Sequence, residues 1–105
     1  MTSRKDPPRL LSFPAVSVLH AVASGIPYGF QIIDHTGLTS GTVYTSLGRL
    51  ERDGYLRSHW EDARVAHHEK RPARRYYAIT APGERVLNDS LRRYRSLQPV
   101  GATRS

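Results

Sequence analysis

Histidine and carboxylate side chains are the first places to look for chemistry, because the chain contains no cysteine. His67 and His68 are adjacent and His59 lies a few residues earlier, with no carboxylate at a convincing zinc-ligand spacing. Asp34 and His35 are accompanied by serines elsewhere, but no pattern assembles a nucleophile, a base and oxyanion donors. We therefore expect no metal site, no cofactor and no enzymatic activity.

Arginine is the other residue type that could do chemistry. The 105 residues include 16 Lys and Arg against 9 Asp and Glu, a formal net charge of +7, and only Lys5 and Lys70 are lysines. Guanidinium groups bind phosphate and guanine through paired hydrogen bonds, so the charge fits a polyanionic partner such as DNA. A basic surface that serves only solubility fits the charge equally well, so both interpretations stay open.

The elements that would position these side chains begin with three predicted helices. The first starts near Phe13, carries Pro14 in its first turn, where a missing N–H costs nothing, and ends at Gly25. The second covers residues 28–35 and is expected to bury Phe30.

The third helix is predicted to begin after an N-cap at Thr39 and to run to Asp53, where it joins the second in a helix-turn-helix. Its apolar face consists of Val43, Leu47 and Leu50. Steps of about 100° per residue place four residues at the centre of the opposite face: Gly41, Thr45, Gly48 and Arg52. An exposed helical glycine costs about 1 kcal/mol relative to alanine, so two of them favour a partner that approaches the backbone closely. A helix that merely tolerates them is the alternative.

Beyond the third helix, apolar and polar residues alternate, as they do in a β-strand. Strands are predicted at 55–60 and 74–80, with Leu56 and Trp60 on the inner face of the first. The charged residues 61–73 between them are predicted to form an exposed hairpin loop. A hairpin directly after a helix-turn-helix predicts a winged helix, a mainly α fold with a small β-hairpin.

Positive charge gathers in this predicted hairpin. Lys70, Arg71, Arg74 and Arg75 lie within six positions. Such clusters are often only solvated hairpin tips, but the hairpin of a winged helix lies beside DNA, so we expect Lys70, Arg71 and Arg74 to contact phosphate or the minor groove. Arg75 alternates onto the inner face and is expected to pack or to form an ion pair instead.

The last predicted helix has Thr80 as its N-cap and an apolar stripe along one side. A domain this small gains stability when such an apolar stripe packs against a second copy of the chain, and the first helix offers the matching surface. The residues predicted to form this two-fold dimer interface are Val18, Val22, Leu87, Leu91, Tyr94 and Leu97.

These elements divide the chain into a flexible basic arm at 1–10, a winged helix-turn-helix domain at 11–80, a dimerisation helix at 81–97 and a disordered tail at 98–105. No apolar run approaches the ~20 residues that a membrane span needs. We expect a cytoplasmic protein without a membrane segment.

Ordered motifs in the chain resemble the PadR family of transcriptional regulators. One is Tyr28-Gly29-Phe30-Gln31-Ile32-Ile33 followed by Leu38-Thr39-Ser40-Gly41-Thr42-Val43-Tyr44. Others are Leu47, Leu50-Glu51, Gly54-Tyr55-Leu56 and the run Arg71-Pro72-Ala73-Arg74-Arg75-Tyr76-Tyr77-Ala78-Ile79-Thr80, with Gly83 after it. Each motif alone is weak, but the ordered set covers most of the predicted folded part.

The resemblance implies a DNA-binding transcriptional repressor that binds a pseudo-palindromic operator as a homodimer. It places Ser40, Thr42 and Thr45 near bases or phosphates, the Tyr44 hydroxyl on a phosphate, and Arg49 on a base edge or the backbone. Some members of the family respond to a small hydrophobic or phenolic effector.

The sequence departs from the family pattern at two positions of the third helix. Ser40 stands where the family often has proline, and Gly48 where a larger polar residue is common. The operator sequence therefore cannot be carried over. Two alternatives remain open, an architectural DNA-binding protein without effector sensing and a winged-helix module for protein interaction.

Overall fold

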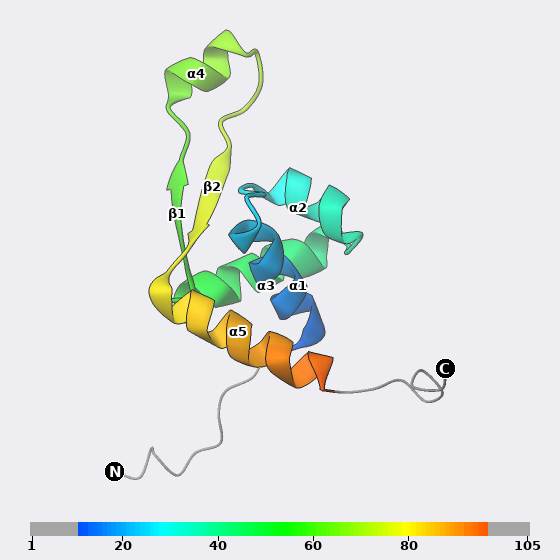
Figure 1. Cartoon of the computed structure of the whole chain (residues 1–105). Coiled ribbons are helices and arrows are strands. Elements are labelled where there is room, and N and C mark those ends of the chain that lie inside the picture. The colour runs from blue at the N-terminus through cyan, green and yellow to red at the C-terminus, as the bar shows by residue number, and fades with distance from the viewer. Residues whose placement is uncertain (1–10, 97–105) are drawn as a thin grey trace.

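The computed structural model describes residues 11–96, and Figure 1 shows a helical body from which one β-hairpin projects. The elements in chain order are α1 (Phe13–Ala23), α2 (Gly29–Thr36), α3 (Ser40–Arg52), β1 (Leu56–Trp60), α4 (Ala63–His68), β2 (Arg75–Ile79) and α5 (Ala81–Arg95). The predicted arm, Leu97 and the predicted tail lie outside the described residues. The predicted fold class, a winged helix-turn-helix followed by a C-terminal helix, is confirmed.

Side-chain caps explain where three of the helices begin. The hydroxyl oxygens of Ser12, Thr39 and Thr80 accept hydrogen bonds from backbone N–H groups in the first turns of α1, α3 and α5. Such caps satisfy donors that the helix itself leaves unpaired. The N-caps predicted at Thr39 and Thr80 are therefore confirmed.

The core is built around α1, which packs against α2, α3 and α5. Val18, Leu19 and Ala21 of α1 have no exposed surface. From α2, Ile32 is fully buried, whereas Phe30 is 73 % exposed. The prediction that Phe30 is buried is therefore wrong. The two side chains lie about 200° apart around the helix and cannot both face α1.

Helix α5 is fixed to the body at both of its ends. At its start the Thr80 hydroxyl donates to the Gly54 carbonyl over 2.6 Å, and a Cβ on Gly83 would lie 2.2 Å from the Tyr55 carbonyl oxygen. Near its end the Tyr94 hydroxyl donates to the Leu11 carbonyl over 2.9 Å. These contacts set the direction of α5 across the base of the domain (Figure 1).

The hairpin, called the wing below (residues 56–79), is a two-stranded antiparallel sheet. Leu56 pairs with Ile79 at the body end, and Trp60 pairs with Arg75 at the outer end. The wing is tied to the body where the Tyr77 N–H donates to the Pro27 carbonyl over 2.7 Å. Its outer part extends beyond the helical body (Figure 1).

Two sequence predictions for the wing need correction. Residues 61–73 contain the short helix α4, capped by the Asp62 side chain, where a loop was predicted. Trp60 is 61 % exposed and is no part of the core, whereas Leu56 is buried as predicted. The strand alternates as expected, but the body that would cover its inner face ends before Trp60.

Two kinds of feature are absent from residues 11–96. No helix in this range is long and apolar enough to cross a membrane. No group of three His, Asp or Glu side chains in the same range lies close enough to hold a metal ion.

Candidate nucleic-acid interface

One side of α3 is open to solvent along its length. Gly41, Thr45, Gly48 and Arg52 are all exposed, as the helical period predicts. A Cβ added at Gly41 or Gly48 would meet no atom within 4 Å, so neither glycine is required by packing within the chain. Two of the four central positions of this helix face therefore carry no side chain.

The side chains predicted to contact DNA from α3 share this open side or flank it. Ser40, Tyr44, Thr45 and Arg49 are exposed, and Thr42 is half-buried. The Thr42 hydroxyl accepts a hydrogen bond from the Thr39 hydroxyl over 2.9 Å, within the N-terminal cap. Their contact with DNA stays a prediction, although the structure brings all five onto one element.

A glycine on the neighbouring helix makes room for the Tyr44 ring. Gly29 at the start of α2 is buried, and a Cβ there would lie 2.5 Å from Cε1 of Tyr44 and 2.6 Å from its hydroxyl oxygen. Only glycine leaves room for the ring at this position. Tyr44 therefore lies against α2, toward the wing side of α3.

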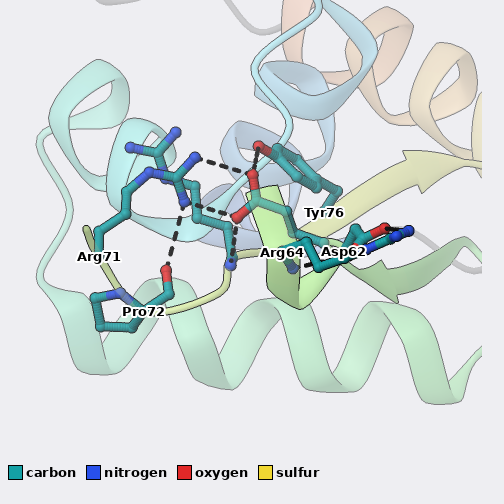
Figure 2. Close-up of polar contacts among 7 residues, drawn as sticks. Asp62, Arg64, Arg71, Pro72 and Tyr76 are labelled. Carbon is teal, nitrogen blue, oxygen red and sulfur yellow. Dashed lines mark hydrogen bonds and ion pairs between the residues drawn. The ribbon is translucent and has the colours of Figure 1, made fainter. Parts of the chain in front are cut away.

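Glu61 organises the outer part of the wing. Its Oε1 and Oε2 accept hydrogen bonds from Arg71 over 2.7 and 2.9 Å, and its carboxylate also accepts from the Arg74 N–H and the Tyr76 hydroxyl (Figure 2). The Glu61 side chain is only 7 % exposed. The hydrogen bonds from Arg71 lower the pKa of the Glu61 carboxyl from 4.5 to about 2.

Arg71 therefore forms an ion pair with Glu61 inside the wing. The same pairing raises the pKa of its guanidinium, and its side chain is 23 % exposed. Both terminal nitrogens of Arg71 bind Glu61 within the wing, and contact of Arg71 with DNA stays a prediction. Its role is to close the segment that contains α4.

The other wing cations differ in their partners. Lys70 is exposed, with a backbone φ of 59°. The Arg74 guanidinium lies 4.3 Å from the centre of the Tyr28 ring. Arg75 donates to the Ser58 hydroxyl over 2.9 Å and lies 3.5 Å from a Glu51 oxygen, so its predicted inward pairing is confirmed.

A hollow of about 500 Å³ separates the wing from α2 and α3. We call it the wing hollow; its lining is Tyr28, Gly29, Phe30, Tyr44, Trp60, Arg71, Pro72, Ala73, Arg74 and Arg75. Hydrophobicity predicts that Phe30 and Trp60 are buried, so the sequence pattern does not identify them as surface residues. The Tyr28-Gly29-Phe30 motif was visible, but only the fold shows that it faces the wing.

A second, smaller hollow lies on the other side of α3, against the start of α1. It measures about 270 Å³ and is lined by Ser12, Pro14, Gly41, Thr42, Thr45, Ser46 and Arg49. The open side of α3 is thus flanked by a depression on each side.

The predicted dimer residues divide into two groups. Val18, Val22 and Leu87 are buried inside their own chain, with Val18 fully inaccessible, and their contact with a partner stays a prediction. Leu91 and Tyr94 are half-buried and keep some surface. Beside Tyr94 lies Phe13 (63 % exposed), with the two ring centres 6.1 Å apart in an edge-to-face arrangement.

The family comparison agrees with this geometry. Residues 18–89 match the Transcriptional regulator PadR-like family. The chain therefore belongs to the PadR-like family of transcriptional regulators, and its DNA-binding regulator fold is that of the family. A comparison with curated protein sequences finds no match.

Several solved structures share the fold. A PadR family transcription regulator from Clostridium difficile R20291 has a TM-score of 0.68 and 20 % identity, over 80 % of this chain and 88 % of that chain. A PadR-like transcription factor from Bacteroides fragilis has a TM-score of 0.64 and 24 % identity, over 77 % of this chain and 79 % of that one. BpsR of Bordetella bronchiseptica has a TM-score of 0.67 and 16 % identity, over 92 % of this chain and 75 % of that one.

Proposed function

We propose that this protein is a cytoplasmic transcriptional repressor that binds a pseudo-palindromic DNA operator as a homodimer. The observation that carries the proposal is the open side of α3, where Gly41 and Gly48 leave the backbone accessible between two hollows. A major groove about 12 Å wide admits a helix and is bordered by a phosphate backbone on each side. A helix with a depression on either flank has the complementary shape.

The polar side chains of α3 suit the two parts of such a contact. Ser40 and Thr42 lie at the helix N-terminus, where free N–H groups and the helix dipole favour a phosphate. Thr45 and Arg49 lie further along, where a base edge is within reach of a side chain. Lys70 and Arg74 supply charge from the wing on the far side of the wing hollow.

A two-fold dimer would supply the second recognition helix. The surface proposed for it combines Phe13 at the start of α1 with Leu91 and Tyr94 of α5, since all three keep apolar surface in a single chain. The two α3 helices would then reach half-sites roughly 34–36 Å apart, one turn of DNA, or a small multiple of that spacing.

A small hydrophobic or phenolic effector belongs to the same proposal. For BpsR, the structural neighbour, DNA binding is regulated by 6-hydroxynicotinic acid. Our proposal for this chain is release from the operator when such a compound binds.

The decisive experiment is selection of binding sites from random duplex DNA with the purified protein, followed by a salt titration on the selected site. Binding through roughly 6–10 phosphates predicts a log–log slope of about −5 to −9. A flat salt response would reject DNA binding and favour the protein-interaction module. Strong binding without a selected consensus would favour the architectural alternative.

A variant pair locates the contact on α3. Thr45→Glu should weaken binding to the selected site by roughly 100-fold or more, because a carboxylate facing phosphates costs several kcal/mol. Asn88→Glu makes the same charge change on an exposed position of α5 and should leave affinity within about twofold. Equal losses in both variants would show that overall charge, and not the α3 face, governs binding.

A further inference from the structure

Exposed aromatic side chains gather around the wing hollow. Across the described residues, five large hydrophobic side chains are exposed, and three of them, Phe30, Tyr44 and Trp60, line this one hollow. Phe30 and Trp60 contribute nothing to the core. Exposed apolar groups concentrated around a concavity are typical of a ligand site, and about 500 Å³ lies within the range of small-molecule pockets.

Two arginine guanidinium groups in the lining of the hollow lie over aromatic rings. The Arg74 guanidinium lies over the Tyr28 ring, 4.3 Å from its centre, and the Arg75 guanidinium lies 5.3 Å from the centre of the Trp60 ring. Aromatic faces hold guanidinium planes in this way, and both groups also stack on a flat ligand. The lining therefore favours a planar aromatic molecule over a branched aliphatic one.

The charge of the ligand follows from the ion pairs of the three arginines in the lining. Arg71 is neutralised by Glu61, and Arg75 lies 3.5 Å from a Glu51 oxygen. Arg74 forms no ion pair among the residues that the structure describes. One positive charge is left to be balanced, so a ligand with a single negative charge matches the hollow better than a multiply charged one.

We infer that the wing hollow binds a flat aromatic monoanion, such as an aromatic carboxylate, and that the bound anion excludes DNA by direct competition. The regulatory half of this inference rests on the proposed function, because Tyr44 and Arg74 line the hollow and are also predicted DNA contacts. A ligand that covers them removes those contacts within one chain. This differs from an effector at the dimer interface, which would have to change the spacing of the two α3 helices.

The first arm of the test measures ligand binding without DNA. Trp60 is the only tryptophan in the chain, so its indole N–H gives a single signal in a ¹H–¹⁵N spectrum that reports directly on the hollow. Naphthalene-2-carboxylate should shift this signal saturably. Naphthalene-2-carboxamide has the same shape without charge, and cyclohexanecarboxylate has the charge without a flat ring. Each should bind at least about tenfold more weakly, the size expected for losing a charged hydrogen bond or a stacking contact.

Two variants and two matched controls complete this arm. Arg74→Gln and Phe30→Ala should each weaken carboxylate binding by about tenfold or more. Arg57→Gln changes an exposed arginine elsewhere on the wing, and Val65→Ala removes exposed apolar surface on α4 outside the hollow; both should bind as the wild type does. No saturable shift, equal binding of the carboxamide, or unchanged binding in both hollow variants would each overturn the inference.

The second arm adds the DNA site selected for the wild-type protein. Competition predicts that the apparent Kd for DNA rises in proportion to carboxylate concentration, with no complex that contains both ligands. A stable ternary complex would overturn the competitive mechanism. DNA that shifts the Trp60 signal while the carboxylate does not would mean that the hollow serves only the phosphate backbone. A protein that binds the carboxylate but no DNA would refute the proposed function and leave the ligand site standing.

Discussion

At the residue scale, Gly29 of α2 allows the ring of Tyr44 on α3 to lie close to the α2 backbone. A side chain at position 29 would occupy the space of the Tyr44 ring. The ring would have to leave, and with it the hydroxyl predicted to contact a phosphate. The absence of a side chain at position 29 of α2 thus sets where the Tyr44 hydroxyl of α3 can lie.

This close approach makes a testable prediction with a matched pair of glycines. Gly29→Ala should lower the free energy of unfolding by about 1 kcal/mol, the low end of the cost of overpacking, because the added methyl group displaces only the exposed end of the Tyr44 ring. Gly48→Ala adds the same methyl group in open space and should raise the free energy of unfolding by up to ~1 kcal/mol through helix propensity. Urea unfolding measures both changes. A neutral effect of Gly29→Ala would show that Tyr44 can move at no cost.

Single residues also show how far sequence patterns reach. The helical period placed Val43, Leu47 and Leu50 in the core and Gly41 and Gly48 outside it, and the structure agrees. Hydrophobicity alone misplaced Phe30 and Trp60, because it predicts burial wherever an aromatic residue occurs. Whether a neighbour covers that residue depends on where the body of the domain ends, which no local pattern contains.

At the element scale, the wing has two parts with different supports. Its inner strands are tied to the body through Tyr77 and Pro27, whereas its outer segment is closed by Glu61 and Arg71. Sequence periodicity found the strands but missed α4, a helix of six residues that is too short to show a period. The pairing of Glu61 with Arg71 spans ten positions and follows only from the fold of the segment.

The lowered pKa of Glu61 predicts how this segment responds to acid. A carboxyl whose pKa is depressed by folding stabilises the folded form fully above its ordinary pKa of 4.5, and that contribution is lost as the pH falls toward the folded value of about 2. Glu61→Gln should therefore be less stable than the wild type at neutral pH. The difference in free energy of unfolding should shrink progressively below about pH 4.5.

Urea unfolding of both proteins from neutral pH down to about pH 3 measures this difference. Glu69→Gln alters an exposed carboxylate in the same segment and serves as the control. A difference between wild type and Glu61→Gln that stays constant over the whole range would contradict the assignment of the low pKa to Glu61.

At the scale of the whole molecule, the sequence predicts a dimer interface of six residues on the first and last helices, and three of them are buried within their own chain. Val18, Val22 and Leu87 pack among α1, α3 and α5, which leaves Leu91, Tyr94 and the unpredicted Phe13 for a partner. Amphipathic spacing identifies an apolar face and cannot say which neighbour covers it. The exposed side of α3 was predictable because it depends on one helix, whereas the wing hollow needs three elements together.

Two exposed phenylalanines provide the test of the dimer. Phe13→Asp places a charge on the proposed interface and should yield monomers in light scattering at concentrations where the wild type is dimeric. An acidic residue in the first turn of a helix is itself favourable, so loss of folding is not expected. Phe30→Asp makes the same change beside the wing hollow and should leave the dimer mass unchanged. A dimeric Phe13→Asp, or a monomeric Phe30→Asp, would place the interface elsewhere.

The two glycines on the open side of α3 have a consequence for the proposed operator. Side chains that pair with base edges are what make one base pair preferable to another, each good pair being worth about 1–3 kcal/mol. Opposite Gly41 and Gly48 no such side chain exists. Aligned operator sequences should therefore carry little information at those positions in each half-site. Their conserved letters should cluster instead where Thr45 and Arg49 reach, and where DNA shape is read at the flanks.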